Sequence, residues 1–231
     1  MKLSIIIPVL NEKKTIAQVI ERVSAQDLSG WEKEIIVIND GSTDGTAEVI
    51  ANLSSLIANL RLITHPTNQG KGAAIKTGLN AATGDAVIIQ DADLEYSPAE
   101  FPALLAELAA HPEAAAIFGS RNLKPKRHGY THYVWGVAVL TFINNLLYGS
   151  RLTDTYTCYK LFRAPVIKSL DLESRGFEFE AEVTCKLLRG GHQIREIPID
   201  YFPRSFAEGK KIRFKDALKG VWTILKYKFL P

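Results

Sequence analysis

Cysteine is scarce in this sequence, with only Cys158 and Cys185 among its 231 residues. Two cysteines without metal-ligand spacing do not suggest a disulfide framework or a cysteine-based zinc module. The five histidines are scattered along the chain and form no zinc pattern. We therefore expect reduced thiols that serve in packing, in a cytoplasmic protein.

Several common nucleotide and hydrolase motifs are also missing. No Gly-x-Gly-x-x-Gly follows an expected strand, which argues against a dinucleotide-binding fold, and no Gly-x-Ser-x-Gly occurs. Residues 68–72, Asn-Gln-Gly-Lys-Gly, resemble the end of a P-loop. They lack its first glycine and the Ser or Thr after the lysine, so a Walker-type nucleotide site is not expected.

Neither net charge nor a long amino-terminal hydrophobic run is prominent. The net charge of +3 is too small to predict nucleic-acid binding, and the apolar run at residues 3–9 is too short for a secretory signal. Acidic residues concentrate in 1–120, whereas lysines and arginines are dense in 121–128 and 204–228. With 46% hydrophobic residues, the chain fits one large α/β domain.

Expected strands and helices alternate through the first half. The continuous apolar run at 3–9 predicts a strand buried on both faces, and Asn11 predicts the cap of a helix that ends near Ala25. This alternation predicts a mainly parallel sheet flanked by helices, with ligands at the carboxyl ends of its strands. Further strands are expected at 34–38, 60–64, 85–90 and 114–119, and helices at 46–58, 71–82 and 98–110.

The second half is organised differently. Residues 129–150 carry no Asp, Glu, Lys or Arg and reach the length of a membrane span, but contain polar residues; a span and a core or interface helix both stay open. A helix at 178–189 and an extended segment at 193–199 follow. Residues 202–211 predict a mobile basic loop. The amphipathic, lysine-bearing helix expected at 214–229 either docks on the core or lies on an anionic membrane surface.

Two carboxylates end the expected strand at 85–90. Asp91 and Asp93 are two residues apart, so their side chains point the same way if the extended backbone continues. Both can then reach one hard cation, and Mg²⁺ or Mn²⁺ prefers such oxygen ligands when it also binds a diphosphate. Two solvated acids in a turn are the alternative reading. The location at a strand end favours an enzyme that handles a nucleotide diphosphate.

Five short motifs then follow expected strands in a fixed order. Together they resemble glycosyltransferase family 2, in its branch of dolichyl-phosphate mannose synthases and related polyprenyl-phosphate glycosyltransferases, over nearly the whole chain. The resemblance implies a GT-A (nucleotide-diphospho-sugar transferase) fold with a Rossmann-like sheet. Three positions depart from the family pattern: Asn39, Glu95, and the run Cys158-Tyr159-Lys160. The motifs are residues 8–12, 39–42, 68–72, 91–93 and 119–121.

The resemblance also implies roles for individual residues. Asp91, Asp93 and Glu95 would be metal ligands, and Asp93 and Arg121 would be catalytic. Structural alternatives stay open, since Asp40 suits a turn, Glu12 suits a first helical turn and Arg204 suits a solvated loop. The substrate-binding residues implied are Pro8, Leu10, Glu12, Ile38, Asp40, Asp91, Ala92, Asp93, Arg121, Arg204 and Lys210.

The reaction expected from this resemblance is metal-dependent transfer of a hexose, with inversion, from GDP-mannose or a UDP-sugar to a polyprenyl or dolichyl phosphate. An ionised phosphate needs no strong protein base, whereas a sugar hydroxyl would need one, with Asp154 or Glu180 as candidates. A soluble or polymeric glycan acceptor and a non-catalytic nucleotide-sugar-binding subunit are the alternatives.

Two further expectations concern organisation and partners. Residues 1–211 are expected to form the catalytic domain, and 212–231 a basic amphipathic helix of the same domain or a membrane-surface appendage. The expected partners are the nucleotide-sugar, the lipid acceptor, and a membrane surface or membrane protein, but no nucleic acid. The enzyme would then be peripheral on the cytoplasmic face of a membrane.

Overall fold

The computed structural model describes residues 1–124, 131–204 and 214–230, and the side chains of all of these except 131–134 and 214. Its centre is a seven-stranded sheet in the order β3-β2-β1-β4-β6-β5-β7. The elements are β1 (Lys2–Val9), α1 (Ile16–Ala25), β2 (Glu32–Asn39), α2 (Thr46–Ser54), β3 (Leu60–Thr64), α3 (Lys71–Ala81), β4 (Ala86–Ile89), η1 (Pro98–Glu100), α4 (Phe101–Ala110), β5 (Ala114–Ser120), α5 (Thr131–Tyr148), β6 (Lys160–Arg163), α6 (Ala164–Ser169), α7 (Phe179–Arg189), β7 (Gln193–Pro198) and α8 (Phe214–Phe229).

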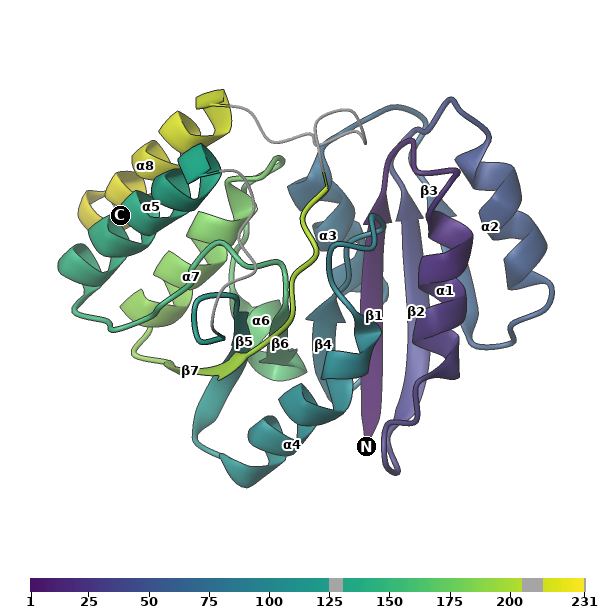
Figure 1. Ribbon diagram of the computed structural model, residues 1–231, viewed down its shortest axis with the longest axis horizontal. Helices are drawn as coiled ribbons and strands as arrows, with labels where there is room; N and C mark the ends of the chain where they lie inside the picture. Colours follow the sequence, from purple (N-terminus) through teal and green to yellow (C-terminus); the bar gives the residue numbers. More distant parts are fainter. Residues whose placement is uncertain (125–130, 205–213, 231) are drawn as a thin grey trace.

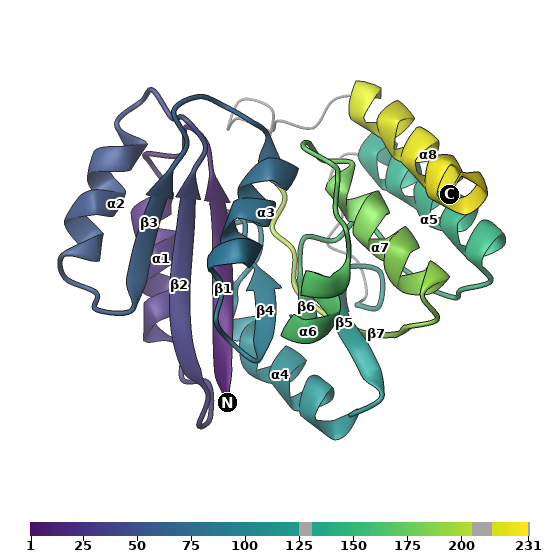
Figure 2. The same ribbon diagram turned by 180° about the vertical axis from the view of Figure 1, so that it is seen from behind.

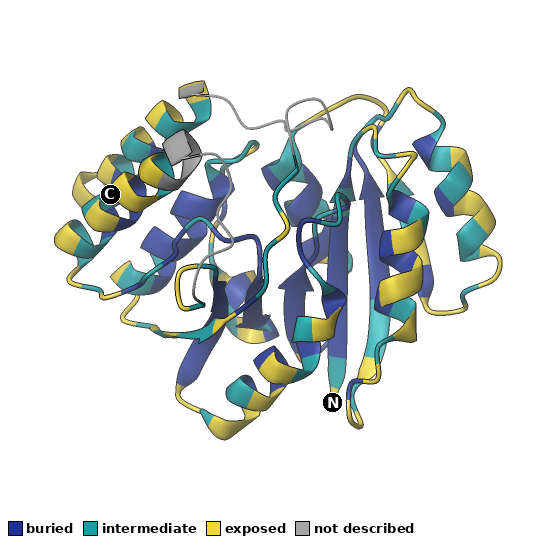
Figure 3. Cartoon of the chain, viewed as in Figure 1, coloured by how far each residue is buried: buried dark blue, intermediate teal, exposed yellow. Residues whose placement is uncertain are grey.

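The sheet is mixed but mainly parallel. Strands β1 to β4 pair in parallel, as do β5 and β7, while β6 runs antiparallel to both β4 and β5. Helices cover both faces, with α1 in front in Figure 1 and α3 in front in the reverse view of Figure 2. Side chains pack on both sides of β1, β4 and β5. Most of their residues are therefore buried and are drawn dark blue in Figure 3.

This topology brings three polar strand ends together. The carboxyl ends of β1, β2 and β4 point to the same edge, since all three strands are parallel. Asp40 continues the register by donating its backbone N–H to the carbonyl of Val9 at 2.8 Å. Residues 8–12, 39–42 and 91–93 consequently meet there, as the sequence predicted.

Helices α5, α7 and α8 form a separate layer beyond the β5–β7 side of the sheet (Figures 1 and 2). Their small core comprises Leu140 from α5, Ala181 and Cys185 from α7, and Ile224 and Tyr227 from α8. Both cysteines are buried and unbridged, which confirms their expected role in packing. No helix within the described ranges is both long and apolar enough to cross a bilayer.

Some expected boundaries were wrong. Asn11 does not cap α1, which begins five residues later at Ile16; instead it adopts a positive φ, and its Oδ1 accepts from the backbone N–H of Thr43 at 2.8 Å. The sequence reading also missed β6 and α6. Strand β6 has only four residues, between Tyr159 and Ala164, too few to show a period.

A half-buried carboxylate ties the amino-terminal ends of the sheet. Glu34 accepts hydrogen bonds from the Ser4 hydroxyl and from Thr83, whose backbone N–H lies 2.6 Å away, and it pairs with Lys2 at 3.0 Å. Burial alone would raise the pKa of Glu34, but the hydrogen bonds outweigh burial and lower that pKa to about 2. The stabilisation is fully present above the ordinary carboxyl pKa and is lost as pH falls toward 2.

We therefore predict that Glu34→Gln lowers the free energy of unfolding by roughly 1–3 kcal/mol at pH 7, and by less than about half as much at pH 3. Urea unfolding at the two pH values measures the difference. Glu32→Gln, an exposed change on the same strand, is the control and should stay within about 0.5 kcal/mol of wild type. An equal loss at both pH values would contradict the assignment.

Candidate active site

The chain leaves β4 through a pinned turn that carries the two aspartates. Gln90 donates its backbone N–H to Ile6 at 2.9 Å, and its Oε1 accepts from the Tyr159 hydroxyl at 2.5 Å. The Ala92 carbonyl accepts from Thr15 Oγ1 at 2.7 Å. These bonds fix residues 90–92 against β1, α1 and the core, so the aspartates are held by the fold.

Each aspartate is paired with a different cation. Asp91 Oδ1 lies 2.8 Å from Lys71 Nζ, and Asp93 Oδ2 lies 2.8 Å from Arg204 Nη2. Burial, together with the neighbouring carboxylates of Asp91 and Glu95, raises the pKa of Asp93 to about 7. The pKa of Asp91 is instead lowered: burial opposes this, but the charges of Lys71 and Arg204 and the hydrogen bonds to the carboxylate together outweigh it. The two carboxylates thus share one electrostatic environment.

Arg204 connects three acidic residues at the same edge. Its guanidinium reaches both oxygens of Glu12, the nearest at 3.0 Å, as well as Asp93, and its backbone N–H donates to Glu95 Oε1 at 2.8 Å. Glu95 Oε2 accepts from the Tyr201 hydroxyl at 2.8 Å. Residues 201–204 therefore lie across the end of the sheet as a strap fastened by Glu95.

The carboxylate oxygens of Asp91 and Asp93 are suitable ligands for a divalent cation. Both are hard carboxylate ligands on one pinned turn. Within the described ranges, no cluster of three or more His, Cys, Asp or Glu is arranged to bind a metal. The Glu95 carboxylate already binds the strap, so its predicted role as a metal ligand stays a prediction. Two carboxylates with the remaining ligands from substrate and water is the usual Mg²⁺ arrangement.

Two glycines explain the Asn-Gln-Gly-Lys-Gly motif. A Cβ at Gly70 would lie 2.3 Å from the Arg175 carbonyl, and one at Gly72 would lie 2.4 Å from the Ser174 carbonyl. The motif thus admits a backbone segment, residues 174–176, against the first turn of α3. That contact brings α7 beside Lys71.

Asp40 holds the loop that precedes this motif. Its carboxylate accepts from the backbone N–H groups of Gln69 at 2.9 Å and Gly70 at 2.8 Å, and lies 2.7 Å from His65 Nδ1. His65 Nε2 lies 2.9 Å from Thr77 Oγ1. Asp40 is buried and anchors the loop in this structure, and its contact with a nucleoside stays a prediction.

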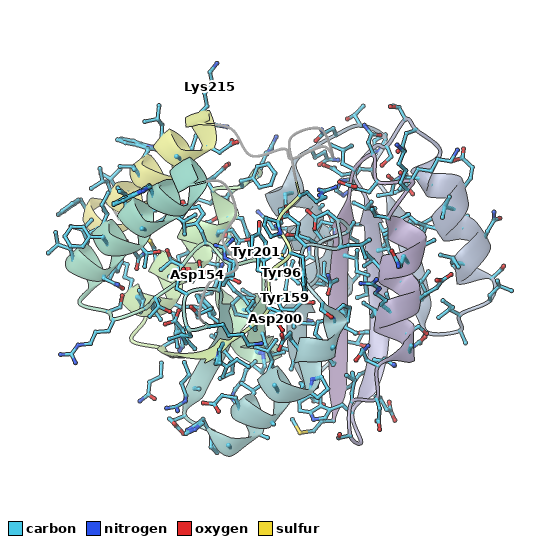
Figure 4. All side chains as sticks on the ribbon, viewed as in Figure 1. Tyr96, Asp154, Tyr159, Asp200, Tyr201 and Lys215 are labelled. Carbon is cyan, nitrogen blue, oxygen red and sulfur yellow. The ribbon has the colours of Figure 1, made fainter. Side chains whose placement is uncertain are left out.

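Arg121, the other predicted catalytic residue, is locked to Asp154. Its Nε and Nη2 lie 2.6 and 2.8 Å from the two carboxylate oxygens, and its guanidinium packs over the Tyr201 ring with 5.0 Å to the centroid. Tyr201 also packs on Tyr96, which stacks on Tyr159 (Figure 4). Arg121 and Arg204 are therefore joined through the strap, although they come from opposite ends of the sequence.

Sequence reasoning assigned no role to Lys71 and Lys160, which the structure places in one ionic network. Lys160 is fully buried and pairs with Glu180 Oε2, while Lys71 lies 3.5 Å from Glu180 Oε1. The Phe-Glu-Phe-Glu run at 177–180 was a signal for Glu180. No local pattern marked Lys160 as buried, because β6 was not recognised.

The remaining predicted residues follow the same geometry. Pro8 and Ile38 are register partners at the ends of β1 and β2, and Leu10 follows β1 directly. Ala92 is buried between the two aspartates. Lys210, like the segment 205–213 around it, lies outside the described residues.

Comparison with solved structures identifies the class of fold. The glucosyl-3-phosphoglycerate synthase of Mycobacterium tuberculosis, solved with Mn²⁺, UDP and phosphoglyceric acid, superposes with a TM-score of 0.76. The match covers 100% of this chain and 79% of that chain at 22% identity. This likeness confirms the GT-A fold that the sequence predicted.

Comparison of sequences identifies the family. The model described as "Glycosyl transferase family 2" matches residues 4–171. The low-salt glycan biosynthesis hexosyltransferase Agl6 of Haloferax volcanii is 31% identical over 92% of this chain. The dolichyl-phosphate beta-glucosyltransferase ALG5A of Trichomonas vaginalis is 28% identical over 97% of this chain and 72% of its own length.

The chain belongs to glycosyl transferase family 2 and is a glycosyltransferase. It spans 52% of the length of Agl6, so it corresponds to about half of that relative. The polyprenyl-phosphate branch expected from the sequence agrees with the dolichyl-phosphate relatives.

The surroundings of two helical glycines predict that replacement by alanine has opposite effects on the stability of the protein. Gly72→Ala should destabilise the protein by roughly 1–3 kcal/mol, because the new Cβ would strike the Ser174 carbonyl and overpacking is costly. Gly136→Ala in α5 is the control, since nothing lies within 4 Å of its Cβ. It should stabilise by about 0.5–1 kcal/mol. Thermal unfolding compares the two, and a stabilising Gly72→Ala would contradict the packing.

Proposed function

We propose that this enzyme transfers a hexose, with inversion, from a nucleotide-sugar to the phosphate of a polyprenyl lipid. The family and the dolichyl-phosphate relatives support the reaction class. Both UDP-sugars and GDP-mannose are candidate donors. The nucleoside would lie at the ends of β1 and β2, near Pro8, Leu10, Glu12, Ile38 and Asp40.

Asp91 and Asp93 would hold Mg²⁺ or Mn²⁺ beside the diphosphate. When bound, the cation would supply charge stabilisation for the leaving diphosphate. Lys71 and Arg204 already face these carboxylates and can add positive charge there, with Lys as a point charge and Arg as a bidentate donor. Arg121 and Lys210 stay proposed phosphate contacts.

The choice of a phosphate acceptor is based on the pairing of Asp154 and Glu180, the two carboxylates that could serve as a base for a sugar hydroxyl. Asp154 is fully buried and bidentate to Arg121, and Glu180 is paired with Lys160. Both carboxylates are therefore already paired with a cation inside the protein. A polyprenyl phosphate needs no such base, because its second pKa near 6 leaves it mostly ionised at neutral pH. Its oxygen can attack the anomeric carbon directly, opposite the leaving diphosphate.

Incubation with radiolabelled UDP-glucose or GDP-mannose, Mn²⁺ and a polyprenyl phosphate should move label into an organic-extractable lipid. Asp93→Asn should lower that transfer by roughly 10²–10³-fold, as loss of a charge-stabilising group does. Asp171→Asn, at an exposed position, should retain wild-type transfer. Label that enters only a water-soluble glycan would assign the acceptor to the alternative class, and absence of transfer to any acceptor would favour a binding subunit.

A membrane surface is the proposed partner because α5 and α8 present matching apolar stripes to solvent. Large exposed side chains recur at i, i+4, i+7 and i+11 on both helices, which lie side by side (Figure 3). The apolar side chains of α8 that dock on the body are others, chiefly Ile224 and Tyr227. The stripes are Trp135, Val139, Phe142 and Leu146 on α5, and Leu218, Trp222, Leu225 and Phe229 on α8.

Charge and aromatic content favour lipid as the occupant of this face. Lys215, Lys219, Lys226 and Lys228 accompany the stripe of α8, and exposed Trp and Phe with lysines suit an anionic interface. We propose peripheral attachment to the cytoplasmic face, since both cysteines are unbridged. The sequence alone suggested a membrane-surface role for 214–229 and left 129–150 open between a membrane span and a core or interface helix. The exposed stripe of α5 supports a surface role for that helix too.

The double variant Phe142→Ser/Trp222→Ser should reduce co-sedimentation with anionic phosphatidylserine vesicles by about tenfold or more, because each buried aromatic contributes roughly 1.5–3 kcal/mol. Leu56→Ser, which is 80% exposed at the end of α2, is the matched control and should leave sedimentation unchanged. Sedimentation of the double variant at the wild-type level would contradict the membrane assignment. Concentration-dependent dimerisation lost in the double variant would instead assign the face to a second copy of the chain.

A further inference from the structure

Glu182 of α7 is a fully buried carboxylate that holds a backbone segment from outside its own helix. Its Oε1 accepts from the backbone N–H of Glu173 and its Oε2 from that of Ser174, each at 2.7 Å. Burial alone would raise the pKa of Glu182, but the hydrogen bonds outweigh burial and lower that pKa to about 2. The charged carboxylate is a strong acceptor, so it fixes the start of this segment to α7.

The segment held by Glu182 encloses the first turn of α3. Its residues 174–176 lie against the two glycines that flank Lys71, and the carbonyl of Arg175 accepts from the backbone N–H of Ala73 at 3.2 Å. Phe177 follows directly, and its ring centroid lies 5.9 Å from Lys71 Nζ. The segment therefore sets both the backbone and the side chain of this lysine.

Tyr227 of α8 completes the hydrogen bonding of Glu182. Its hydroxyl donates to Glu182 Oε1 at 2.7 Å and lies 3.3 Å from Glu173 Oε2. Its ring packs against Lys186, which pairs with Glu182 at 2.9 Å. Tyr227 is only 7% exposed, so these contacts are made inside the protein. They tie the last turn of α8 to the segment that encloses the start of α3.

We propose that Tyr227 is a positioning residue for the donor site. It acts through Glu182 and the segment 173–177, and the group that it positions is Lys71. Since Lys71 Nζ lies 2.8 Å from Asp91 Oδ1, a shift of the segment would move this positive charge relative to the nucleotide diphosphate. The inference rests on the proposed function, because it requires a diphosphate beside Asp91. The helix that carries the proposed membrane face would then also brace the donor site.

Calorimetric titration with UDP, and in parallel with GDP, in Mn²⁺ measures the effect on nucleotide binding. For the nucleotide that wild type binds, Tyr227→Phe should weaken affinity by roughly threefold to tenfold, because a hydrogen bond to a charged group is lost. Only a hydroxyl is removed and Glu182 keeps its two backbone donors, so the variant should fold. Tyr148→Phe is the matched control, since it removes a hydroxyl that joins α5 to α8 at the Ile224 carbonyl, 3.1 Å away. It should change affinity by less than about twofold.

A double-mutant cycle separates positioning of Lys71 from a general effect on the fold. In the Lys71→Met background, Tyr227→Phe should weaken nucleotide affinity by less than about 1.5-fold further, because the group that it positions is gone. Full additivity of the two losses, an unchanged affinity in Tyr227→Phe, or an equal loss in Tyr148→Phe would overturn the inference and leave the proposed function intact. Failure of wild type to bind either nucleotide would overturn the proposed function and this inference with it.

Discussion

The site depends on the mutual neutralisation of buried charges. Lys160, Glu180, Lys71 and Asp91 alternate in sign from the core to the edge of the sheet, and Arg204 closes the series against Asp93. An isolated buried charge costs several kcal/mol, so each member requires its neighbour. The ion pairs consequently bring four separate segments together: the start of α3, the exit of β4, the β6–α7 region and the strap at 201–204. The proposed diphosphate and its cation would enter a site that is already close to charge balance.

Backbone proximity makes this network possible. Gly70 and Gly72 let residues 174–176 approach the first turn of α3, and Asp40 holds the loop in front of that turn. The same contacts place α7, and hence Glu180, next to Lys71. Helices α5 and α8 then pack on α7, so the exposed apolar face belongs to the layer that also forms one wall of the site. The proposed membrane face and the proposed donor site are in this way connected through α7.

The sequence was informative where a pattern is local. Alternating strands and helices predicted a mainly parallel sheet, and the polar residues after β1, β2 and β4 predicted the edge at which the site lies. The Asp91-Ala92-Asp93 turn and Arg204 were found from the sequence, and the structure joins them. The sequence could not predict that Glu95 fastens the strap, that Asp40 anchors a loop, or that Asp154 neutralises Arg121. Each of these contacts joins residues that lie 25–109 positions apart in the chain.

The sequence by itself determined the family and the order of the main strands along the chain, and it named candidate residues for a diphosphate, because these depend on residue type and spacing. Only the tertiary structure decided which acidic groups are already paired, and with which cations. It also decided that the apolar stripes of α5 and α8 point to solvent. The physical reason is that ionic pairing and exposure are set by short distances between segments far apart in the chain, and these distances arise only in the folded protein.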